Sequence, residues 1–81
     1  MKVNFFTTLG CHLCDQALAL LRNIEASGFA IVINEIEIAD DNALVEKYGI
    51  RIPVVLIDGG DNDLGWPFTE EELQKFLEHP S

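Results

Sequence analysis

Residues 2–14 read KVNFFTTLGCHLC, a β-rich run that leads through a short turn into two closely spaced cysteines. The run over residues 2–7 predicts a strand, because it is rich in residues that favour extended backbone. Beyond Cys11 the period changes, and the apolar positions predict a helix to about residue 27 with a buried face made of Leu13, Ala17, Leu20, Leu21 and Ile24. A strand that runs directly into a helix predicts an α/β unit with Cys11 on the helix's first turn.

The next stretch completes a β-α-β unit. Ser27-Gly28 ends the helix, since glycine suits the left-handed conformation of a C-terminal cap. Residues 30–38 are rich in β-branched side chains and alternate at their end between isoleucine and glutamate, which predicts a strand with one wetter face. Such a unit requires a right-handed crossover, so the two strands should be parallel.

The second half of the chain predicts a short helix, a hairpin and a last helix. Residues 40–42 offer N-caps for a helix to Tyr48, and the run IPVVLI at 52–57 predicts a buried strand with proline at its entrance. The turn-forming run at 58–63 then predicts a hairpin into a further strand. Thr69 and Glu72 have the spacing of a capping box for the last helix.

Length and charge restrict the class of protein. Eighty-one residues allow one domain, residues 1–81, and 48% hydrophobic residues with a mean hydropathy of +0.16 argue against disorder. A net charge of −9 argues against nucleic acid and anionic membranes, both of which need a basic face. No apolar run approaches the roughly 20 residues of a membrane span, and no signal peptide is evident, so we expect a cytoplasmic protein.

The chain has two cysteines, Cys11 and Cys14. A disulfide-stapled secreted domain would carry more cysteines, and a zinc ribbon would need a second pair of ligands. Two thiols three residues apart in a reducing compartment therefore indicate redox or metal chemistry.

A Cys-x-x-Cys motif after the first strand of this pattern resembles the thioredoxin-like superfamily, and the short chain resembles its glutaredoxins. Residues 47–53 (KYGIRIP) resemble the thioredoxin run that ends in a cis-proline facing the motif. The resemblance implies a four-stranded mixed sheet in the order 2-1-3-4, helices on both faces, and thiol–disulfide exchange without an organic cofactor. In that reaction Cys11, nearer the free N–H groups of the helix, attacks and Cys14 resolves. Ile52 and Pro53 would shape the substrate groove.

The chain departs from glutaredoxins around the motif. His12-Leu13 lies between the cysteines, and Thr7 to Gly10 replace the segment whose lysine helps to bind glutathione. Residues 66–69 (WPFT) replace the Gly-Gly and acidic pair that hold the γ-glutamyl end of glutathione. We therefore expect a monomeric protein whose substrates are protein or small-molecule disulfides, with poor use of glutathione.

Other interpretations remain open at this point. The same sulfurs could carry a metal or a [2Fe–2S] cluster in a dimer, because one chain supplies only two of the ligands required. The fold could also serve partner docking, or the cysteines could be small core residues. His12 is interpreted as an exposed modulator and not as a metal ligand. Arg51 is either a contact for an anionic partner group or a solvated side chain, and His79 is expected to be a tail residue.

Overall fold

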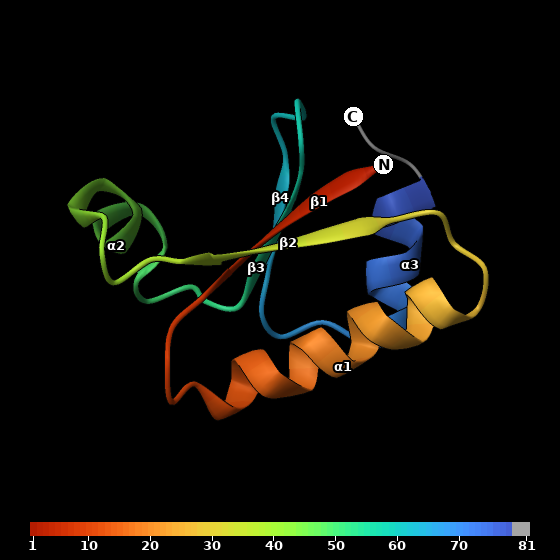
Figure 1. Ribbon diagram of the computed structural model, residues 1–81, viewed down its shortest axis with the longest axis horizontal. Coiled ribbons are helices and arrows are strands. Elements are labelled where there is room, and N and C mark those ends of the chain that lie inside the picture. The colour runs from red at the N-terminus through yellow and green to blue at the C-terminus, as the bar shows by residue number, and fades with distance from the viewer. Residues whose placement is uncertain (79–81) are drawn as a thin grey trace.

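The computed structural model describes residues 1–78, so the expectation for His79 lies outside the described residues. The elements are β1 (Lys2–Thr7), α1 (His12–Ala26), β2 (Val32–Glu37), α2 (Asn42–Tyr48), β3 (Val54–Ile57), β4 (Asp63–Gly65) and α3 (Glu70–Glu78). Their types and order are those predicted from the sequence (Figure 1). Within this part of the chain, none of the helices has the length and apolar character needed to cross a bilayer.

The four strands form one mixed sheet in the order β2-β1-β3-β4, as predicted. β1 is parallel to β2 and antiparallel to β3, and β4 continues the sheet antiparallel to β3. Thr7 is opposite Glu37, and Phe6 is opposite Val54. The ends of β1 and β2 and the beginning of β3 therefore lie together at one end of the sheet (Figure 1).

The two faces of the sheet have separate apolar cores, because successive side chains of a strand point to opposite faces. Phe5 belongs to the larger core, which includes Leu21 of α1 and Leu73 of α3. Phe6 belongs to the smaller core, where its ring stacks on Tyr48 of α2 with centroids 4.3 Å apart. Helices cover both faces, as predicted.

The buried face of α1 differs from the prediction at its first turn. Leu13 is 45% exposed, whereas Cys14 is 2% exposed and belongs to the larger core. The buried residues of the helix are Cys14, Ala17, Leu21 and Ile24. Their spacing of three, four and three residues follows the helical period, and a cysteine side chain packs like a small hydrophobe. Leu13 is one residue off this face and therefore points towards solvent.

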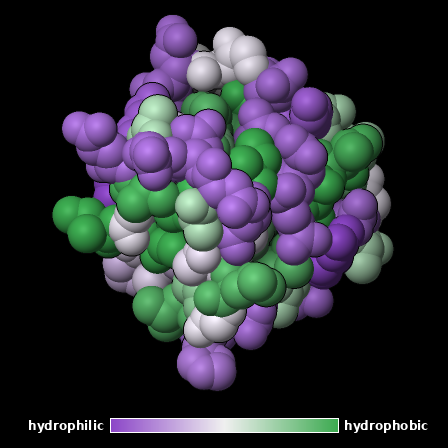
Figure 2. Space-filling model, turned by 60° about the vertical axis from the view of Figure 1, so that its left-hand side comes forward, coloured by the Kyte–Doolittle hydropathy of each residue, from purple (hydrophilic) through white to green (hydrophobic). Residues whose placement is uncertain are grey.

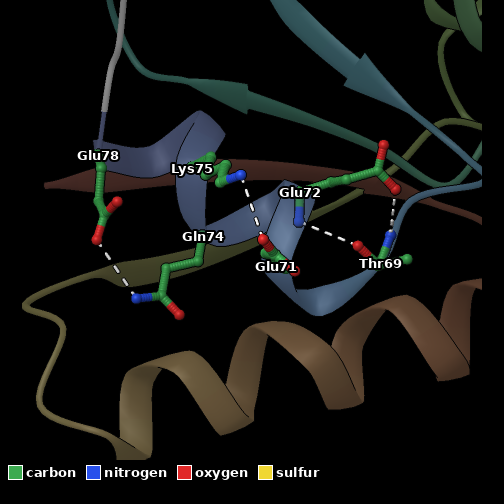
Figure 3. A network of polar contacts seen from close by, with 6 residues as sticks. All are labelled: Thr69, Glu71, Glu72, Gln74, Lys75 and Glu78. Atoms are coloured by element: carbon green, nitrogen blue, oxygen red, sulfur yellow. Dashed lines mark hydrogen bonds and ion pairs between the residues drawn. The ribbon is translucent and has the colours of Figure 1, made fainter.

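The predicted capping box forms at the beginning of α3 (Figure 3). The Thr69 N–H donates to Glu72 Oε1 at 2.9 Å, and the Glu72 N–H donates to Thr69 Oγ1 at 3.1 Å. Both bonds satisfy backbone donors that the first turn of a helix cannot use internally.

We expect Thr69→Ala to lower the free energy of unfolding by about 1 kcal/mol, because the hydroxyl acceptor at the N-cap is lost. Urea denaturation followed by circular dichroism measures this change. Thr69→Ser is the matched control, since it keeps the hydroxyl and should stay near the parent stability. Equal stability of the alanine variant and the parent would contradict the predicted contribution of the cap.

Candidate active site

The two cysteines lie where β1 passes into α1. Cys11 is the N-cap of the helix with extended backbone (φ −85°, ψ 102°), and Cys14 lies in its first turn. A disulfide joins them, with Cα atoms 5.2 Å apart. The Cys14 N–H donates to Cys11 Sγ at 3.1 Å. The capping position thus holds a sulfur where helices more commonly place an oxygen acceptor.

Burial distinguishes the two sulfurs. The Cys14 side chain is buried in the larger core, whereas Cys11 is partly exposed at the edge of that core. A helix N-terminus favours an anion, and the free backbone N–H groups there can donate to a thiolate. The arrangement therefore presents one approachable sulfur in a position that favours its ionised form, with a second sulfur behind it.

Ile52 and Pro53 lie at the same end of the sheet. They immediately precede β3, whose Val54 pairs with Phe6 near the end of β1. The Ile52–Pro53 peptide is cis, and Pro53 is buried while Ile52 is partly exposed. The Pro53 carbonyl accepts from the Trp66 N–H at 3.0 Å, which fixes this segment to the chain beyond β4.

The Trp66–Pro67 peptide is also cis, and the sequence did not predict it. Only about 5–6% of X-Pro bonds in folded proteins are cis, so a proline alone is a weak signal.

Arg51 and His12 occupy different environments. The Arg51 guanidinium donates to both carboxylate oxygens of Asp63 and lies over the Tyr48 ring, 5.9 Å from its centroid. The hydrogen bond from Arg51 holds the pKa of Asp63 below its ordinary value of 3.8. This pairing supports the loop before Pro53, while a contact of Arg51 with a substrate stays a prediction. His12 is exposed at the first position of α1, next to Cys11.

A hollow of about 310 Å³ lies beside the cysteine motif. Its lining comes from the end of β1, the following turn, α1 and β2, namely Thr7, Thr8, Leu9, Gly10, Asp15, Glu35 and Glu37. Sequence reasoning missed this hollow, because the glutamates on β2 were interpreted as a wetter strand face. Among residues 1–78, no group of three or more His, Cys, Asp or Glu side chains is placed to hold a metal ion.

The fold and the cysteine pair together define a thioredoxin-fold protein with a disulfide-capable Cys-x-x-Cys pair. A family model described as Glutaredoxin-like domain (DUF836) matches residues 2–78. The chain therefore belongs to this glutaredoxin-like family, which agrees with the resemblance noted in its sequence.

Solved structures show the same fold. The chain is similar to a Northeast Structural Genomics target protein from X. campestris, with 34% identity to its crystal structure, a TM-score of 0.82, and coverage of 94% of this chain and 95% of that one. The solution structure of that target gives 35% identity, a TM-score of 0.80 and coverage of 96% and 94%. Thioredoxin 1 from Thermosipho africanus shares the fold at 22% identity, with a TM-score of 0.63 and coverage of 96% of each chain. No curated protein matches the chain significantly.

Proposed function

We propose that this protein is a thiol–disulfide oxidoreductase in which Cys11 attacks and Cys14 resolves. The observation that carries the proposal is the pair itself: one partly exposed and one buried sulfur, bonded to each other across the first turn of α1. A purely structural pair would have no need for an approachable sulfur. The reducing cytoplasm is the compartment in which we expect the dithiol form to be maintained.

The proposed reaction reduces one substrate disulfide per turnover. The Cys11 thiolate attacks one substrate sulfur, the substrate S–S bond breaks, and the other substrate sulfur leaves as a thiolate. The departing substrate thiolate takes the proton of Cys14. Cys14 then attacks Cys11 Sγ, which breaks the mixed disulfide, releases the second substrate thiolate and leaves the Cys11–Cys14 disulfide. Two electrons have passed to the substrate, and an external dithiol must return them to the protein.

The surface around the motif favours polypeptide disulfides over glutathione. Leu9 and Leu13, on either side of Cys11, are 92% and 45% exposed. Figure 2 shows apolar side chains that reach the surface among hydrophilic ones. Exposed aliphatic groups beside Cys11 can bury apolar area against side chains that flank a disulfide in a protein. The net charge of −9 opposes the approach of anionic glutathione disulfide.

A single-turnover experiment tests the proposed function. The reduced protein is mixed with excess bis(2-hydroxyethyl) disulfide, which is neutral, or with oxidised glutathione, and free thiols are alkylated and counted by mass spectrometry. We expect both thiols to disappear with the neutral disulfide, and at least about tenfold more slowly with glutathione. Two thiols that persist with every disulfide would overturn the proposal.

The metal or cluster alternative has its own measurement. Visible absorption bands in the freshly purified protein, together with bound iron, would favour a cluster carrier that uses the same sulfurs. The redox function is preferred because the two sulfurs lie within bonding reach of each other, whereas one chain supplies only two of the ligands that a metal or cluster requires.

A further inference from the structure

Glu37, the last residue of β2, holds two segments of backbone with one carboxylate. Its Oε1 accepts from the Leu9 N–H at 2.9 Å, and its Oε2 accepts from the Ala39 N–H at 3.0 Å. Leu9 belongs to the turn before Cys11, whereas Ala39 belongs to the loop that leads to α2. The carboxylate therefore bridges the two loops that leave the ends of the parallel pair β1 and β2.

Apart from its contacts with Glu37, the turn that carries Cys11 is held by few interactions. It is closed by a hydrogen bond of 3.3 Å from the Cys11 N–H to the Thr8 carbonyl, and Gly10 provides the positive φ of +80° that the turn requires. The Leu9 side chain and Gly10 are both exposed, so packing contributes little to holding the turn. The hydrogen bonds of the Leu9 N–H and the Thr8 side chain to Glu37 attach the turn to the sheet.

The state of the carboxylate suits this role. The Ala39 N–H, and to a smaller extent the Leu9 N–H, hold the pKa of Glu37 below its ordinary value of 4.5. The group is thus ionised at neutral pH and accepts strongly. Because the folded pKa is the lower one, the contribution of the contact is complete above pH 4.5 and is lost as pH falls through the folded pKa.

We propose that Glu37 is a positioning residue for Cys11: it fixes the turn so that Cys11 stays at the N-cap with its sulfur on the Cys14 N–H. This inference rests on the proposed function, and it adds a residue that neither the motif nor the superfamily resemblance indicates. When the Leu9 contact is lost, the backbone of Cys11 is free to leave the capping conformation. The thiolate then loses a donor that stabilises it.

A simple charge effect predicts the opposite change. A carboxylate near Cys11 disfavours the thiolate, so its removal would make Cys11 more reactive at a given pH. Glu35 provides the matched comparison, because it lies two residues earlier on β2 and lines the same hollow. Its ion pair with Arg22 is 3.8 Å long and exposed, and it does not involve the turn.

The test measures the pH profile of iodoacetamide alkylation in the Cys14→Ser background, where Cys11 is the one thiol that can be alkylated. We expect Glu37→Ala to lower the alkylation rate at pH 7 about three- to tenfold relative to Glu35→Ala and to move the pH midpoint upward; tenfold corresponds to one pH unit. Glu37→Gln keeps one acceptor oxygen, so the pH midpoint of its alkylation should lie between the midpoints of Glu37→Ala and Glu35→Gln.

Two outcomes would overturn the inference: a midpoint for Glu37→Ala equal to or below that of Glu35→Ala, or, should the alanine variant not fold, a midpoint for Glu37→Gln equal to or below that of Glu35→Gln. Alkylation does not depend on turnover of a disulfide. If the parent protein reduces no disulfide while Glu37→Ala still shifts the midpoint upward, the proposed function fails and the positioning role of Glu37 stands.

Discussion

Cys11→Ser is expected to abolish the reduction of disulfides, lowering the rate on the order of 10³-fold or more, as when other covalent nucleophiles are removed. A serine hydroxyl is not ionised at neutral pH and cannot replace the thiolate. Cys14 cannot take over the attack, because it is only 2% exposed and packs in the larger core. The single-turnover assay with bis(2-hydroxyethyl) disulfide measures the loss.

Cys14→Ser is the matched control. It keeps Cys11 at the N-cap, so the first attack should proceed and the mixed disulfide should accumulate because no second thiol resolves it. Mass spectrometry detects this species as an added mercaptoethanol group on Cys11. Undiminished reduction by Cys11→Ser, or failure of Cys14→Ser to form the mixed disulfide, would contradict the assigned roles.

Leu21→Ala should have a large effect on stability although it lies outside the site. Leu21 is 0% exposed in α1 and packs in the larger core, so its truncation removes buried area and leaves a cavity. The expected loss is about 2–5 kcal/mol in the free energy of unfolding. A domain of this size has about 4–12 kcal/mol in total, so the variant should be close to unfolding at 37 °C.

Leu9→Ala makes the same chemical change at a side chain that is 92% exposed. Its free energy of unfolding should stay within about 0.5 kcal/mol of the parent value. Urea denaturation of both variants in the same redox state provides the comparison. Similar losses for the two variants would show that α1 does not pack as described.

The order of the elements could be predicted because each has a local signal. The change from strand-like to helical periodicity at Cys11, Gly28 after the first helix, and the spacing of Thr69 and Glu72 are all contained in short windows. The disulfide and the depth of Cys14 also follow from local spacing, once the motif is placed on the first turn of a helix. The prediction that Leu13 lies on the buried face was wrong. It counted the leucine and not the neighbouring cysteine as a core side chain, whereas the structure buries Cys14 and exposes Leu13.

The remaining parts of the site depend on contacts between distant residues. Glu37 accepts from Leu9, 28 residues earlier, and nothing near Glu37 distinguishes it from Glu35 as a solvated residue. The pairing of Arg51 with Asp63 likewise requires the register of β4 against β3. Such contacts follow from strand pairing, which single-sequence patterns do not specify.

The strand order leaves β2 and β4 at the two edges of the sheet, where unpaired backbone groups can recruit another chain. β4 spans three residues, and β2 carries Glu35 and Glu37 towards its end. The short edge strand β4 on one side and the carboxylates of β2 on the other both discourage edge-to-edge pairing with another chain. Mutual repulsion between copies of charge −9 also opposes aggregation, although the protein has solvent-exposed leucines. We propose that the protein acts as a monomer.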